Sequence, residues 1–176
     1  VTLVSCAIFP LAGLNRIMLV DAGVPLATIG WVVGTLGPIS MLAVSLISMP
    51  LMARAGLQSA FLLFGLLAII TVGLLAFASA RTFPSLAIGA SIITGAAVSG
   101  IYVTVMAKIL GWSAGAQPAT DYAAYYGISR LASTVITIIA AQLAARIDWT
   151  VFYAAGAIIL TAVLFFANLR IFRRET

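Results

Sequence analysis

Six runs of about twenty apolar residues, separated by short polar clusters, are the feature that most constrains this chain. An α-helix needs roughly 20 mainly apolar residues to cross a hydrocarbon core about 30 Å thick. The runs do not alternate between polar and apolar residues, as the strands of a membrane β-barrel would. Only 7% of the residues are charged, against about 25% in an ordinary soluble domain. The sequence therefore predicts an all-α integral membrane bundle of six transmembrane helices.

Clusters of Gly, Pro, Arg and Asp mark the ends of the predicted helices. The linkers are short, so consecutive helices form antiparallel hairpins and residues 1–176 make a single six-helix domain with no room for a soluble one. The chain begins almost inside an apolar run, at Val1, and we expect it to be a piece of a longer protein. The predicted spans are residues 1–20, 26–52, 57–78, 84–110, 118–145 and 149–169.

The basic residues that give a net charge of +5 lie mostly at the ends of spans, which argues against binding to nucleic acid. Cytoplasmic loops of membrane proteins carry an excess of Lys and Arg. We therefore expect the C-terminus to be cytoplasmic. One side would hold Arg54, Lys108, Arg170, Arg173 and Arg174, and the other Arg81 and Arg146, with Arg16 nearby.

The residues that usually carry catalysis are scarce. The chain has one cysteine, Cys6, no histidine, and four carboxylates that all lie near span ends. Histidine is the commonest metal ligand and general base, and a disulfide framework needs paired cysteines. We expect no catalytic residues, no metal site and no cofactor, and hence a protein that is not an enzyme.

Arg130 is the most informative residue. It lies twelve residues after Pro118, the start of the fifth span, or roughly 18 Å along a helix, near the middle of a bilayer. An arginine there costs at least about 2.5–3.5 kcal/mol and normally faces a water-filled cavity or a partner. We expect it to lie on a substrate path or gate. The alternative is an arginine fixed to a carboxylate or to helix-end carbonyls for packing alone.

The fifth span also carries a polar stripe along its first half, because polar residues recur there every four positions. We expect this stripe to line a cavity, although polar contacts between packed helices are the alternative. A carboxylate in a first turn, such as Asp121, is favoured by the helix dipole but is also a candidate gate. One row is Asp121, Tyr125, Ser129, Ser133 and Thr137, and its neighbour is Tyr122, Tyr126, Arg130 and Thr134.

Three residues outside the fifth span join the candidates. Asn15 and Arg16 lie near the end of the first span, where Arg16 contacts substrate, reaches Asp21 or extends to the interface. Tyr102 lies deep enough in the fourth span to line a cavity. The full set of candidates for a substrate path or gate is Arg130, Asp121, Tyr125, Tyr126, Ser129, Ser133, Arg16, Asn15 and Tyr102.

Two segments resemble a branch of the major facilitator superfamily that includes peptide and acetyl-CoA transporters, muropeptide permeases and single-unit siderophore permeases of bacterial inner membranes. The stretch Val20-Asp21-Ala22-Gly23-Val24-Pro25-Leu26-Ala27-Thr28-Ile29-Gly30-Trp31 looks like the junction of that branch's seventh and eighth helices. Pro118-Ala119-Thr120-Asp121-Tyr122-Ala123 resembles the start of its eleventh helix. Met52-Ala53-Arg54-Ala55-Gly56 resembles the shortened superfamily loop between the eighth and ninth helices, but lacks its usual acid and second basic cluster.

The resemblance covers the whole chain as the C-terminal half of a twelve-helix transporter. It implies a small solute bound near the midplane and moved by alternating access. It also implies proton-coupled uptake, and Asp121, where muropeptide permeases tend toward Gln, favours a siderophore. The implied partners are the bilayer, the missing N-terminal six helices, the solute and protons. The alternatives are a self-contained six-helix oligomeric channel and a membrane assembly subunit.

Overall fold

The computed structural model describes residues 1–113, 115 and 117–172. Over these residues it contains helices and no strands, and six helical stretches are long and apolar enough to cross a membrane. The prediction of six apolar helices is therefore confirmed, with ends within a few residues of those expected. The six stretches are Thr2–Asp21, Leu26–Ala55, Leu57–Arg81, Pro84–Trp112, Pro118–Ala144 and Trp149–Ile171.

The first two stretches are each interrupted. The first consists of α1 (Thr2–Gly13) and α2 (Asn15–Asp21), with a break after Gly13, a residue that costs about 1 kcal/mol relative to Ala inside a helix. The second begins with α3 (Leu26–Thr28) and a π-helical segment, η1 (Ile29–Val33), before α4 (Gly34–Ala55). Two prolines of this stretch, Pro38 and Pro50, both lie inside α4, downstream of the π-helical segment.

The later helices begin and end where their sequence provides turn and cap residues. Gly56, with φ of 84°, separates α4 from the next helix, and prolines occupy the first turns of the fourth and fifth stretches. Asp148 caps α8, since its Oδ1 accepts a hydrogen bond from the Thr150 N–H at 2.7 Å. The helices are α5 (Leu57–Arg81), α6 (Pro84–Trp112), α7 (Pro118–Ala144), α8 (Trp149–Ala167) and the π-helical η2 (Asn168–Phe172).

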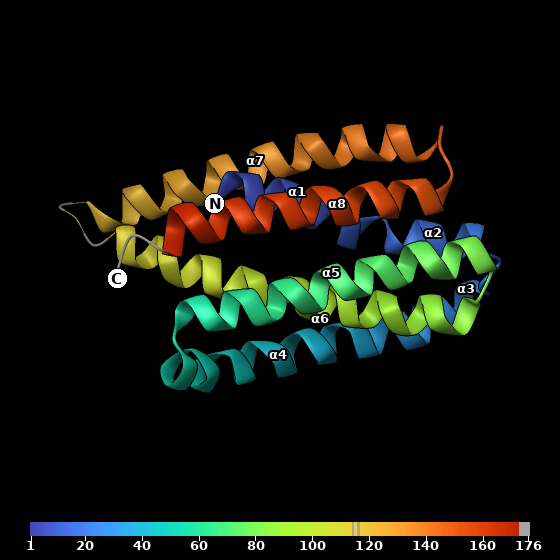
Figure 1. The fold of residues 1–176 in the computed structure, drawn as a ribbon, viewed down its shortest axis with the longest axis horizontal. Coiled ribbons are helices and arrows are strands. Elements are labelled where there is room, and N and C mark those ends of the chain that lie inside the picture. Colours follow the sequence, from blue (N-terminus) through green and yellow to red (C-terminus); the bar gives the residue numbers. More distant parts are fainter. Residues whose placement is uncertain (114, 116, 173–176) are drawn as a thin grey trace.

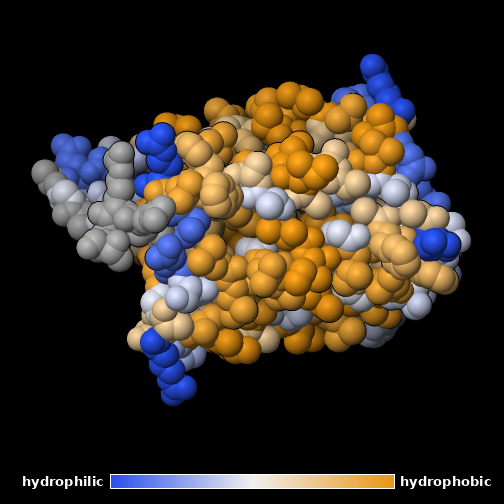
Figure 2. All heavy atoms as spheres, in the orientation of Figure 1, coloured by the Kyte–Doolittle hydropathy of each residue, from blue (hydrophilic) through white to orange (hydrophobic). Residues whose placement is uncertain are grey.

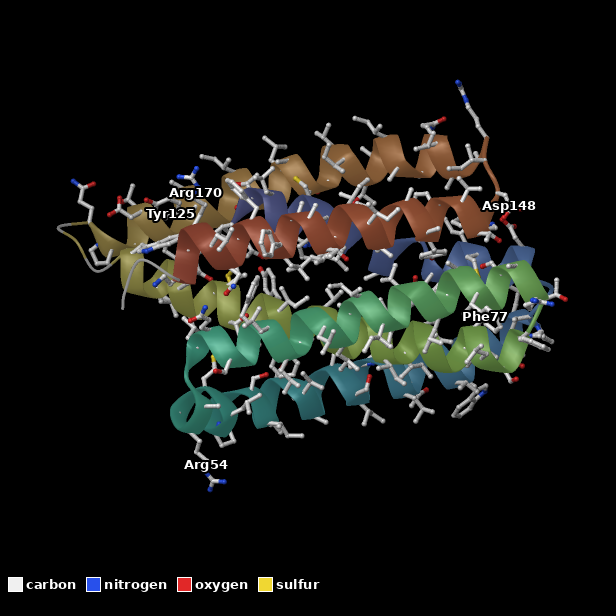
Figure 3. The ribbon with its side chains drawn as sticks, viewed as in Figure 1. Arg54, Phe77, Tyr125, Asp148 and Arg170 are labelled. Carbon is white, nitrogen blue, oxygen red and sulfur yellow. The ribbon has the colours of Figure 1, made fainter. Side chains whose placement is uncertain are left out.

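On the face seen in Figure 2, apolar residues cover most of the middle of the molecule, and polar residues gather at its two ends. Arg54 and Arg170 lie at one end, which we call the Arg54 end, and Asp148 lies at the other, the Asp148 end (Figure 3). Lys108, near the last turn of α6, is 6% exposed and lies 5.7 Å from the Trp112 ring centre. Arg173 and Arg174, which contributed to the predicted orientation, lie outside the described residues.

The six spans form two consecutive sets of three along the chain, which we call units, the first containing α1 to α5 and the second α6 to α8. Each unit places its middle span against the other unit, because α4 packs on α6 and α7 packs on α1. The third spans, α5 and α8, pack on each other, and α7 and α4 lie at opposite edges of the bundle (Figure 1). The first unit starts at the Arg54 end and the second at the Asp148 end, so they run in opposite directions.

Candidate functional site

Arg130 lies on the exposed side of α7 and its charged group rests on an aromatic ring. The guanidinium carbon is 4.6 Å from the centre of the Phe9 ring of α1. Within the described part of the chain, Arg130 forms no ion pair. A cation over a ring face is attracted by the ring quadrupole, which takes the place of a carboxylate partner here.

Tyrosines from α6 and α7 surround this pair. Tyr102 meets the Phe9 ring edge-on at 5.8 Å between centres, and it lies close to Tyr126, Tyr122 and Arg130. Tyr126 stacks on Tyr122, and the Tyr122 hydroxyl donates to the Met106 sulfur at 3.7 Å. Three predicted residues, Arg130, Tyr126 and Tyr102, therefore form one cluster with the unpredicted Phe9 and with Tyr122, which was only placed on the stripe.

The serines of the predicted stripe form hydrogen bonds to α1 and to the backbone of α7 itself. Ser129 and Thr2 share a hydrogen bond of 3.1 Å, and Ser129 is only 3% exposed. Ser133 donates to the carbonyl of Arg130 at 2.9 Å. The serines of α7 thus make polar contacts within the bundle, whereas Arg130 is exposed and lines an open groove. A groove of about 270 Å³ beside them is lined by Phe9, Gly13, Arg130, Ser133, Thr134, Thr137 and Ile138.

Two other predicted residues lie apart from this cluster. Asp121 is in the first turn of α7, where the helix dipole favours a carboxylate. Tyr125 is 46% exposed, and its ring lies 6.3 Å from that of Trp112 near the Arg54 end (Figure 3). The structure does not bring either residue to the Phe9 ring.

Asn15 and Arg16 line a second cavity of about 270 Å³, which is bounded by α1, α2, η1, α4 and α6. Asn15 is 3% exposed, and its side-chain oxygen accepts a hydrogen bond from the Tyr153 hydroxyl at 2.8 Å. Arg16 is exposed and forms no ion pair within the described residues. The contact considered for it, Asp21, instead accepts from the indole N–H of Trp149 at 2.8 Å.

The two cavities are adjacent, since both are lined by Phe9 and Gly13 of α1. Sequence reasoning missed Phe9 because one aromatic residue in an apolar run has no distinguishing pattern. It also missed Ser91 of α6, which lines the second cavity and lies among many small residues. Arg130 and Arg16 therefore line neighbouring cavities.

The described residues contain no group of three His, Cys, Asp or Glu side chains that could hold a metal ion. Comparisons of the chain with protein-family models, with curated proteins and with solved structures find no match.

Proposed function

We propose that the chain is the C-terminal six-helix half of a secondary membrane transporter of the major facilitator type. The observation that carries the proposal is that the middle spans α4 and α7 each pack against the other unit, while the two units run in opposite directions. Such transporters contain two inverted three-helix repeats within each six-helix half. The packing of this chain supports that architecture independently of the sequence resemblance.

The exposure of the helices supports a second half that covers one face. Helices α4 and α7 are mostly exposed, whereas half of the residues in the apolar windows of α1, α5 and α6 are buried. The exposed side of α7 carries Arg130, and an arginine facing lipid at that depth is costly. A partner half over α7 and α4 would enclose this charge and turn the two open cavities into a central path.

In this proposal a small solute binds beside Arg130 and Phe9, and the halves rock about it to give alternating access. The sequence resemblance adds proton-coupled uptake of a siderophore-like solute in a bacterial inner membrane. The Arg54 end would be cytoplasmic, since Arg54, Lys108 and Arg170 lie there, against Arg81 and Arg146 at the other end.

The test is uptake by the complete protein that contains this chain, reconstituted in liposomes with a trapped pH indicator and supplied with a panel of ferric siderophores. We expect solute-dependent proton entry with the native protein and loss of it in Arg130→Ala, at normal membrane insertion. Arg146→Ala, which removes an exposed arginine at the end of α7, is the control and should transport normally. Unchanged transport by Arg130→Ala would contradict the role of this residue.

A further inference from the structure

The cavity beside Asn15 and Arg16 contains three polar side chains in an otherwise apolar wall. Asn15, Arg16 and Ser91 come from α2 and α6, and the wall around them includes Phe9 and Met41. The cavity volume of about 270 Å³ fits a small organic group. A site that is apolar with a few placed polar groups is typical of ligand pockets.

Ser91 is 4% exposed, yet its hydroxyl has no hydrogen-bond partner among the described residues. Among the described residues, every side-chain nitrogen or oxygen that is fully sealed from solvent has a hydrogen-bond partner. The Ser91 oxygen has no partner, so it keeps a small accessible surface. Ser91 is also one of the residues that line the cavity. A buried hydroxyl without a partner is destabilising unless a ligand or water supplies one.

Asn15 contributes a donor whose direction is fixed. Its side-chain oxygen is held by the Tyr153 hydroxyl at 2.8 Å, which leaves the amide N–H₂ to face elsewhere. No described residue accepts from this nitrogen. Arg16 adds a guanidinium that forms no ion pair within the described residues. The cavity is therefore lined by three side chains that carry hydrogen-bond donors, and it has no carboxylate among its lining residues.

We propose that this cavity binds the carboxylate of a small organic solute, with Arg16, Asn15 and Ser91 as donors and the apolar wall around the body of the solute. The planar guanidinium matches the two oxygens of a carboxylate. The inference rests on the proposed transport function and names its substrate class as organic carboxylates with an apolar part.

The test is calorimetric titration of the complete protein in phosphatidylcholine nanodiscs with 3-phenylpropionate and with its neutral isostere 3-phenylpropanamide. We expect the carboxylate to bind at least about tenfold more tightly than the amide, because a hydrogen bond to a charged group is the stronger kind. Arg16→Gln should abolish this preference and Ser91→Ala should weaken it. Arg146→Gln removes a positive charge from the same end of the bundle, outside the cavity, and should preserve it.

Equal affinity for the two probes, no binding of 3-phenylpropionate, or an unchanged preference in Arg16→Gln would each overturn the proposal. Nanodiscs that contain phosphatidylglycerol test whether a lipid headgroup, in place of the carboxylate of a solute, occupies the cavity. If this lipid blocks the probe in the native protein, a lipid headgroup occupies the cavity and the assignment to a solute is wrong. None of these failures would alter the uptake expected to depend on Arg130, so the two proposals fail separately.

Discussion

The guanidinium of Arg130 lies over the ring of Phe9, with 4.6 Å between the guanidinium carbon and the ring centre. A double-mutant cycle with Phe9→Leu and Arg130→Gln measures this interaction. We expect a coupling energy of about 0.5–1 kcal/mol in the free energy of unfolding in detergent, the range for exposed cation–π pairs. The more distant pair of Phe77 and Arg81, at 6.0 Å, is the control and should couple less. Additive effects of the Phe9 and Arg130 substitutions would contradict the contact.

The buried hydrogen bond between Tyr153 and Asn15 gives a prediction about stability. Tyr153→Phe leaves the Asn15 oxygen buried without its donor, which should lower the free energy of unfolding by about 1–3 kcal/mol. Tyr125→Phe is the matched control, since Tyr125 is 46% exposed, and it should change stability by less than about 0.5 kcal/mol. Equal effects of the two substitutions would show that the bond does not contribute.

The contact between α5 and α6 depends on Gly100, because a Cβ there would overlap the ring of Phe64. Gly100→Ala should therefore destabilise the bundle by about 1–3 kcal/mol, the usual cost of overpacking. Gly127→Ala in α7, where a Cβ meets nothing within 4 Å, should change stability by less than about 1 kcal/mol. Adding Phe64→Leu to Gly100→Ala should restore part of the loss, and no restoration would argue against this packing.

The cap of α8 gives a prediction about pH. Hydrogen bonds from Thr150 lower the pKa of the Asp148 carboxyl from its ordinary value. A lowered folded-state pKa stabilises the protein above the unfolded pKa of about 3.9, and this contribution is lost as the pH falls through the folded value. At pH 7 Asp148→Ala should lower the melting temperature, and the difference from the native protein should shrink below about pH 4. A difference that is constant from pH 7 to pH 3 would contradict this.

The orientation of the chain can be tested by cysteine labelling in intact cells. With Cys6→Ser as background, Ala55→Cys probes the Arg54 end and Ala145→Cys the Asp148 end, and neither substitution removes a charge. We expect a membrane-impermeant maleimide to label position 145 and not position 55, because the basic residues favour a cytoplasmic Arg54 end. The opposite labelling pattern would reverse the proposed orientation.

Much of the fold was predictable because apolar runs, prolines and glycines determine where membrane-length helices begin and end. The break after Gly13 and the π-helical segment at Ile29–Val33 were not, since each depends on local backbone geometry that no residue pattern specifies. The packing of α4 and α7 against the opposite units could not be predicted from residue spacing either. Helix pairing depends on the shapes of packed faces.

The candidate site was predictable in its charges and less so in its contacts. A polar stripe with Arg130 at its centre follows from four-residue spacing, but the partner of Arg130 is Phe9, an apolar residue from another helix. Asn15 and Arg16 were candidates as polar residues near the end of an apolar span. Their association with Ser91 requires α2 and α6 to bound one cavity, which depends on tertiary packing.

The intact mass of the native protein isolated from its membrane tests most directly whether this chain is one half of a transporter. We expect a polypeptide close to twice the length of this 176-residue chain, with six further apolar runs before Val1. A native polypeptide that consists of these 176 residues alone would contradict it. Such a result would favour an oligomeric six-helix channel or an assembly subunit.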